Sequence, residues 1–235
     1  MTLLFMTGTG PATRYRPHVD GGEQLTSTED PMEYLVTMTT HVPDGTPGQA
    51  VDDIRTREAA RSRELAAQGH LLRLWRPPLQ PGEWRTLGLF AAEDDGQLEK
   101  VLASMPLRVW RRDEVTPLSP HPNDPENPAV AAAKGVDGST EFLTTFTISV
   151  PEGTPRQAVE NTEAREAQRA QELAGQGHLQ RLWALPGESR TLGLWRAQDA
   201  AEMQAILKSL PLDAWMTVQT TPLTGHPSDP ALTTP

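Results

Sequence analysis

The pattern of hydrophobic and polar positions along this chain occurs twice, with the same order of strand-like and helix-like segments each time. Each time, a stretch of alternating apolar and β-branched residues comes first, YLVTMTTHV from Tyr34 and FLTTFTISV from Phe142, and predicts a strand. A long charged segment with apolar residues at helical spacing follows and ends at Gly69 or Gly177, which predicts a helix closed by a glycine C-cap. Two more apolar stretches, HLLRLWR and EWRTLGLFAA in the first copy, predict two strands joined by a turn.

Each predicted long helix begins with a similar motif. TPGQ from Thr46 and TPRQ from Thr154 place Pro directly after Thr and Gln three positions after Thr. This pattern predicts a capping box, with Thr as the N-cap and Pro as the first helical residue. Apolar residues at helical spacing within 98–105 then predict a shorter helix that ends at Pro106, and a last strand is expected over about 109–118.

The two copies align almost end to end, which indicates a tandem duplication. AAQGHLLRLW, from Ala66, reappears as AGQGHLQRLW, from Ala174, and the second copy is three residues shorter only in a Pro/Gly loop. The copies are offset by 108 residues, from Ala66 to Ala174. A repeat of that length has the size of a small domain and is too long for a solenoid unit. We expect a flexible extension at 1–31, a first domain at 32–125, a linker at 126–139, a second domain at 140–230 and a tail at 231–235.

The predicted order of elements in each copy is βαββαβ. This order is typical of the α+β ferredoxin-like fold, an antiparallel sheet with both helices on one face. The other face of such a sheet is uncovered and needs a partner. Because the chain carries two copies, we expect the two open faces to cover each other within one chain.

Composition narrows the functional classes. The chain of 235 residues has 21 Lys and Arg against 31 Asp and Glu, a net charge of -10, and its arginines are scattered among acidic residues, which argues against nucleic-acid binding. The absence of cysteine excludes disulfides, thiolate metal sites and thiol nucleophiles. No segment is apolar enough to span a membrane, and the start lacks the basic region of a secretory signal. We therefore expect a cytoplasmic protein without membrane or nucleic-acid partners.

A glutamate falls on the apolar stripe of the long helix in both copies. Val51, Glu58 and Leu65 share one helical face, and Glu166 is the counterpart of Glu58 in the second copy. A carboxyl group on such a face is costly unless it is paired, protonated or in a wet pocket. Burial would raise its pKa and make it suitable as a general acid or base. The alternative is a structural ion pair with a nearby arginine.

Histidine and tryptophan supply further candidates. His121 and His226 stand in His-Pro dipeptides after the last predicted strand of each copy and are candidates to line a pocket. Trp75 and Trp183, on predicted strands, either belong to a core or interface or contact a ligand. The histidines show no paired metal-ligand spacing, so we expect no metal.

Several motifs recur in both copies: the strand that ends in a Pro turn, the helix with its Glu, G-x5-W in GHLLRLWR and GHLQRLWA, the turns MPL and LPL, and the endings LSPHP and LTGHP. With these motifs, almost the whole of each copy resembles the muconolactone delta-isomerase family. The resemblance implies a dimeric α+β barrel, here within one chain. It also implies a cofactor-free isomerase of bacterial aromatic catabolism that moves the double bond of an unsaturated lactone (muconolactone to 3-oxoadipate enol-lactone) by proton transfer. Because family assemblies are decamers, five two-domain chains are expected to form an equivalent homo-oligomer.

The resemblance also assigns roles residue by residue. Glu58 and Glu166 align with a helical Glu of the family and are the expected catalytic bases. Arg76 matches the family's Arg after Trp and is expected to bind a substrate carboxylate, whereas the second copy has Ala184 there, which puts the second site in doubt. The remaining expected contacts to a lactone or aromatic-derived acid are Arg73, Arg181, His121, His226, Trp75 and Trp183.

Three functions remain open from the sequence. The first is an isomerase of the muconolactone type, with one or both copies active. The second is a non-catalytic small-molecule-binding or scaffold protein on the same fold, and the third is a related barrel enzyme such as a cofactor-free monooxygenase. Ala184 and the duplication favour drift from the standard substrate, whereas the retained Glu and His-Pro motifs favour a working pocket.

Overall fold

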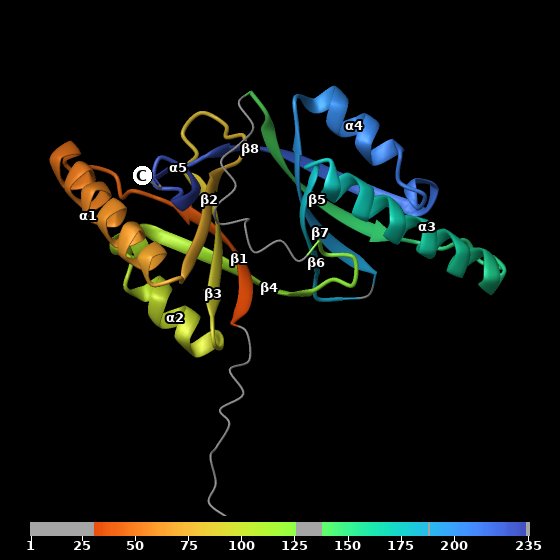
Figure 1. Cartoon of the computed structure of the whole chain (residues 1–235). Coiled ribbons are helices and arrows are strands. Elements are labelled where there is room, and N and C mark those ends of the chain that lie inside the picture. Colours follow the sequence, from red (N-terminus) through yellow and green to blue (C-terminus); the bar gives the residue numbers. More distant parts are fainter. Residues whose placement is uncertain (1–30, 126–137, 188, 234–235) are drawn as a thin grey trace, which may run out of the picture.

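The computed structural model of the chain describes residues 31–125, 138–187 and 189–233 (Figure 1). The expected extension at 1–31 and linker at 126–139 therefore lie almost entirely outside the described residues. The first repeat contains β1 (Met32–Thr40), α1 (Gly48–Ala67), β2 (Leu71–Arg76), β3 (Arg85–Ala92), α2 (Asp95–Ala103), η1 (Pro106–Trp110) and β4 (Arg111–Pro120). The second contains β5 (Thr140–Ile148), α3 (Arg156–Gly175), β6 (Leu179–Ala184), β7 (Arg190–Ala197), α4 (Ala200–Lys208), η3 (Asp213–Trp215) and β8 (Met216–Gly225), followed by α5 (Pro230–Thr233).

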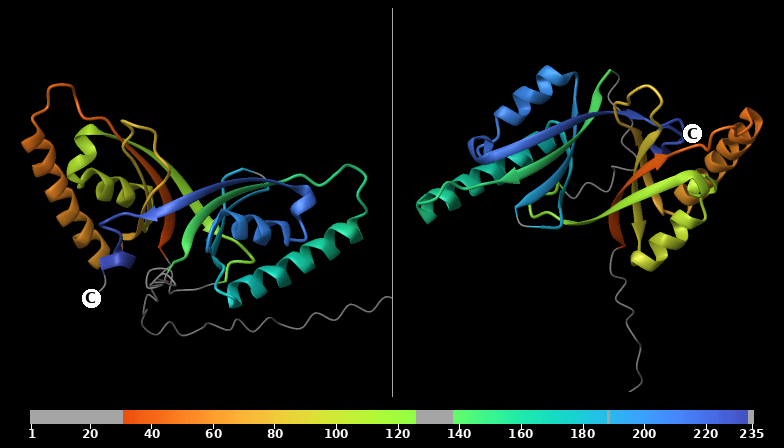
Figure 2. Two further views of the ribbon diagram at one scale, coloured as in Figure 1. Left: turned by 90° about the horizontal axis from the view of Figure 1, so that it is seen from above. Right: turned by 180° about the vertical axis from the view of Figure 1, so that it is seen from behind.

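The eight strands form one closed barrel. Each repeat contributes an antiparallel sheet, in the order β4-β1-β3-β2 or β8-β5-β7-β6, and the edges meet where β2 pairs with β8 and β4 with β6. The long helices and their shorter partners lie on the outside, at opposite ends of the molecule (Figures 1 and 2). The predicted α+β fold, two ferredoxin-like repeats joined as an intramolecular dimeric α+β barrel, is confirmed.

Strand alternation gives each sheet two buried faces. Residues such as Tyr34 and Val36 of β1 pack under the helices of the first repeat, and Phe142 and Phe146 of β5 do the same in the second. The opposite faces meet inside the barrel in a third core, which is rich in leucine and contains both Trp75 and Trp183. The uncovered face predicted from the sequence is thus covered by the other repeat.

The long helices begin differently from the prediction. Each begins one residue after its proline, and the hydroxyl of Thr46 donates to the carbonyl oxygen of Pro43 at 2.6 Å instead of capping the helix. Thr154 bonds to Pro151 in the same way. The capping-box prediction is wrong because a preceding turn takes up the threonine hydroxyl. The glycine ends are as expected, since Gly69 and Gly177 have φ values of 78° and 79° just after the helices.

None of the described helices combines the length and the apolar character that crossing a bilayer requires. The expected cytoplasmic location stays a prediction.

Candidate functional site

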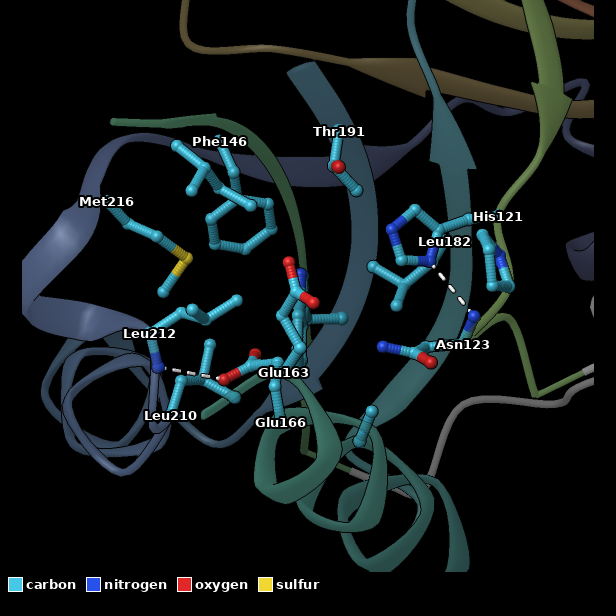
Figure 3. A pocket seen from close by; sticks show the side chains of 14 residues that line it. His121, Asn123, Phe146, Glu163, Glu166, Leu182, Thr191, Leu210, Leu212 and Met216 are labelled. Atoms are coloured by element: carbon cyan, nitrogen blue, oxygen red, sulfur yellow. Dashed lines mark hydrogen bonds between the residues drawn. The ribbon is translucent and has the colours of Figure 1, made fainter. Parts of the chain in front are cut away.

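Each repeat holds a pocket between its long helix and its sheet, and each pocket is completed by the other repeat. The first pocket has a volume of about 320 Å³ and takes Glu58 from α1, Arg76 from the end of β2, and His226 from the loop after β8 of the second repeat. The second pocket has a volume of about 330 Å³ and takes Glu166 from α3 and His121 from the loop after β4 of the first repeat (Figure 3). The structure therefore brings Glu58, Arg76 and His226 together, and separately Glu166 and His121.

Glu58 is held at the wall of the first pocket by two donors. The backbone N–H of Leu107 donates to its Oε2 at 2.8 Å, and Arg111 Nη1 donates to its Oε1 at 3.1 Å. Its side chain is only 13 % exposed, and this burial raises the pKa of the carboxyl, although the Leu107 N–H and the Arg111 guanidinium oppose the rise. The group is thus an anchored carboxylate with an increased affinity for a proton. Sequence analysis left open an ion pair with a nearby arginine, and the partner is Arg111 of β4.

Glu166 occupies the same position in the second pocket with one donor fewer. The backbone N–H of Leu212 donates to its Oε2 at 3.0 Å, and Met216 stands where the first repeat has Arg111 (Figure 3). Burial raises the pKa of Glu166, and only the Leu212 N–H opposes the rise. This carboxyl therefore has the backbone anchor of Glu58 without its cation.

Both pocket histidines are neutral, with Nδ1 accepting a backbone hydrogen bond and the ring proton on Nε2. The backbone N–H of Ser228 donates to Nδ1 of His226 at 3.1 Å, and that of Asn123 donates to Nδ1 of His121 at the same distance. An accepting Nδ1 leaves the ring proton on Nε2. Burial, assisted by Arg76, lowers the pKa of His226 to about 4, and burial lowers the pKa of His121 although Asp124 opposes it.

The other predicted contact residues lie at the junctions between the repeats. Arg73 pairs with Glu141 at 2.7 Å and with Asp229 at 3.1 Å, and the indole N–H of Trp75 donates to Glu141 at 2.7 Å. The second junction repeats this arrangement with Arg181, Glu33, Asp124 and Trp183. None of Arg73, Arg181, Trp75 and Trp183 lines either pocket, so the substrate contact predicted for them finds no support in the geometry.

The junctions nevertheless position the histidine loops. Asp229, three residues after His226, also accepts the backbone N–H of Leu74 at 3.1 Å, which ties the loop to β2. Asp124 accepts the N–H of Leu182 at 2.8 Å and ties the His121 loop to β6. Each pocket therefore depends on the closure of the barrel.

Sequence reasoning missed two arginines of the first pocket. Arg111 lies on β4, and Arg55 lies one helical turn before Glu58 with its guanidinium 4.4 Å from the ring centroid of Trp84. The aligned copies carry a signal for both, because the second copy has Met216 and Glu163 at these positions. In the part of the chain that the structure describes, no cluster of three or more His, Asp or Glu side chains is arranged to hold a metal ion.

Comparisons with known proteins agree with this architecture. The family model described as muconolactone delta-isomerase matches residues 32–124 and again 140–229. Muconolactone Delta-isomerase 1 of Acinetobacter lwoffii is 34% identical over 92 residues, which cover 39% of this chain and 93% of that protein. Muconolactone Delta-isomerase of Cupriavidus pinatubonensis is 33% identical over 92 residues, 39% of this chain and 97% of that protein. A solved structure described as a heme-binding protein from Thermus thermophilus has a TM-score of 0.54 and 12% identity, and it covers 84% of this chain and 92% of its own, a likeness of fold alone.

Proposed function

Since this chain belongs to the muconolactone delta-isomerase family, we propose that its first pocket moves the double bond of a carboxylate-bearing unsaturated lactone by proton transfer. The observation that carries the proposal is the meeting of Glu58, Arg76 and His226 in one pocket, although they come from three distant segments. These residues are a base, a cation and a neutral hydrogen-bond donor, and the reaction needs one of each.

Glu58 is the proposed base and acid. Its carboxylate takes a proton from the γ-carbon of the lactone ring, and the electron pair of the broken C–H bond enters a dienolate that extends to the carbonyl oxygen. The same carboxyl then returns the proton to the α-carbon, so the double bond has moved and the chemistry uses no cofactor. Burial suits Glu58 to this role, because its raised pKa makes it a stronger base than an exposed glutamate. The Leu107 N–H uses one lone pair of the carboxylate and leaves others for the substrate.

The negative charge of the dienolate needs a donor near the carbonyl oxygen. His226 supplies its Nε2–H, because the Ser228 N–H occupies Nδ1 and the low pKa keeps the ring neutral. A fixed donor in a half-buried pocket stabilises developing charge more than water does. His226 comes from the second repeat, so the proposed site exists only in the closed barrel.

Two arginines suit the carboxylate of the substrate. Arg76 is exposed at the end of β2 on the rim of the pocket, and Arg55 is oriented by stacking on Trp84. A guanidinium binds a carboxylate through two parallel hydrogen bonds, which fixes the orientation of the ligand as well as its affinity. The lactone ring is thereby turned towards Glu58.

The test is a direct isomerase assay. Muconolactone is mixed with the purified protein in deuterium oxide, and product formation and deuterium incorporation are followed by NMR. Glu58→Gln should lower turnover roughly 100- to 10,000-fold, the usual contribution of a positioned proton-transfer group, and Glu166→Gln should lower it far less. Circular dichroism checks that both variants fold. Full turnover by Glu58→Gln contradicts the assigned base, and a folded wild-type protein without turnover or exchange contradicts the activity and favours a binding or scaffold role.

Further assembly of the chain into a homo-oligomer is part of the same proposal. The resemblance to the family implies a ring of five two-domain chains. Native mass spectrometry at working concentration should show that species, and a monomer alone would contradict it.

A further inference from the structure

The second pocket differs from the first at every position that carries an arginine. Glu163, Ala184 and Met216 stand where the first repeat has Arg55, Arg76 and Arg111. Strand pairing supports the last equivalence, because Arg111 pairs with Thr40 in the first sheet and Met216 pairs with Ile148, the counterpart of Thr40, in the second. The polar residues change in the same sense, since Ile148 and Ala170 replace Thr40 and Ser62 of the first pocket.

The groups that move a proton are nevertheless retained. Glu166 keeps its backbone donor from Leu212, and His121 keeps its donor from Asn123 at the same distance as in the first pocket (Figure 3). The two cavities also have nearly the same volume. The second pocket has therefore lost the means to bind an anion and kept the means to transfer a proton.

The charge of the second pocket opposes a carboxylate ligand. Among its described lining residues there is neither lysine nor arginine, His121 is neutral, and two carboxyl groups, Glu163 and Glu166, face the space (Figure 3). Glu163 is exposed. An anion entering here would lose water, gain no cation and be repelled by both carboxylates. Phe146, Leu182 and the other apolar walls suit an uncharged ligand instead.

We propose that the second pocket is a separate site for an uncharged, apolar unsaturated lactone, in which Glu166 moves the proton. In the reaction, Glu166 takes a proton from one ring carbon, the electron pair of the broken C–H bond forms a dienolate beside the Nε2–H of His121, and the proton returns to the other end of the conjugated system. Nothing is oxidised or reduced, and no group leaves. The inference takes its chemistry from the proposed function of the first pocket but differs in substrate class.

The experiment compares two substrates in the full chain. α-Angelica lactone has the ring of the enol-lactone product with a methyl group in place of the carboxymethyl group, so it reports on an uncharged lactone that undergoes the same proton transfer in the opposite direction. The measured quantity is the ratio of α-angelica lactone turnover to muconolactone turnover. Glu166→Gln should lower this ratio and Glu58→Gln should raise it, each roughly 100-fold or more, because each variant removes the proton-transfer group of one site. Glu152→Gln, in the exposed turn before α3, is the matched control and should leave the ratio unchanged.

A gain of function tests the basis of the selectivity. Asp113 accepts a hydrogen bond from Arg111 Nε at 2.6 Å in the first repeat, and Val218 is its counterpart in the second. In the Glu58→Gln background, Ala184→Arg combined with Met216→Arg and Val218→Asp gives the second pocket two of the three cations of the first, together with this acidic partner. Muconolactone turnover should then rise roughly tenfold to 100-fold, the effect of a charge-assisted anchor.

Two results would overturn the inference: loss of α-angelica lactone turnover in Glu58→Gln but not in Glu166→Gln, or no turnover of this lactone by the wild-type protein. Failure of the first proposal looks different, because the wild-type protein would then leave muconolactone unchanged whatever happens to the uncharged lactone.

Discussion

The two junctions between the repeats are near copies of each other, whereas the two pockets are not. At one junction Arg73 binds Glu141 and Asp229, and at the other Arg181 binds Glu33 and Asp124 with distances that differ by at most about a tenth of an ångström. The pockets share a glutamate, a histidine and their backbone donors, yet all three arginines of the first are absent from the second.

The difference shows which parts of the duplicated chain are constrained together. Each junction closes the barrel and also ties down the loop that completes the pocket of the other repeat. Loss of either junction would therefore damage the first pocket, because the barrel that delivers His226 would open. A change inside the second pocket has no such consequence for the first. A tandem repeat can in this way keep its interface while the lining of one pocket changes.

The largest expected effect comes from breaking a junction. Asp229→Asn leaves the guanidinium of Arg73, whose side chain is 4 % exposed, with Glu141 as its remaining anionic partner. We expect the free energy of unfolding to fall by about 3 kcal/mol, the lower end of the cost of breaking a buried ion pair. Asp124→Asn should cost less, because Arg181 is 17 % exposed and water replaces part of the lost contact. Urea titrations of both variants measure the difference, and equal losses would contradict the asymmetry.

Arg76, which is replaced by Ala184 in the second repeat, is expected to give the first pocket its affinity for a carboxylate substrate. Arg76→Ala should raise the KM for muconolactone roughly tenfold, because a charge-assisted bond to a substrate is lost from an exposed position. The kcat should change little, because the proposed contact of Arg76 with the substrate carboxylate would be the same in the ground state and the transition state. Steady-state kinetics measure both constants. Arg112→Ala removes the same charge from an exposed position of β4 outside the pocket lining and serves as the control. An unchanged KM in Arg76→Ala would remove Arg76 from the substrate site.

Much of the fold follows from the sequence because it depends on local signals. The alternation in 34–42, the glycines after the long helices and the apolar spacing of 98–105 predict elements that the structure contains. The uncovered apolar face and the second copy predict that the two sheets cover each other, whereas the barrel is what the resemblance to the family implies. The threonine caps failed because Ser and Thr hydroxyls bond equally well to a neighbouring turn.

The candidate site was only partly predictable. Glu58 could be identified because its spacing from Leu65 along one helix is enough to place both residues on the same face. The entry of His226 into the first pocket depends on the pairing of β2 with β8, which joins the first repeat to the second, and no local pattern encodes it. Arg73 was assigned to substrate because its charge suits an anion, but its partners Glu141 and Asp229 come from the other repeat. Comparison of the two copies marks Arg111 as an arginine without a counterpart, but Arg63, Arg108 and Arg112 share that property and lie outside the pocket lining, so only the fold assigns Arg111 to the pocket.

The pH profile tests the contribution of Arg111 to the difference between the pockets. A base must be ionised, so kcat/KM should fall as the pH drops through the pKa of Glu58, which burial raises above its ordinary value and Arg111 partly restores. Arg111→Met with Asp113→Val reproduces the second repeat and removes the cation. Arg111 lowers the pKa of Glu58 more than Asp113 raises it, so removal of both charges should raise this pKa. The acid limb of the profile should therefore move to higher pH. His226, with a pKa of about 4, should add no limb near 6.5. A limb that stays in place would show that Arg111 does not act on Glu58.

The smallest expected effect concerns the scaffold that the repeats share. Gly69 and Gly177 end the long helices at φ values of 78° and 79°, where an alanine is strained, and a methyl group at either position would meet no described side chain. Gly69→Ala and Gly177→Ala should therefore each lower the free energy of unfolding by about 1 kcal/mol through backbone strain alone. The two losses should add in the double variant, because the helices lie at opposite ends of the barrel (Figure 1). Thermal and urea unfolding measure all three variants. Unequal losses, or a double variant far from the sum, would show that the repeats differ in stability as well as in their pockets.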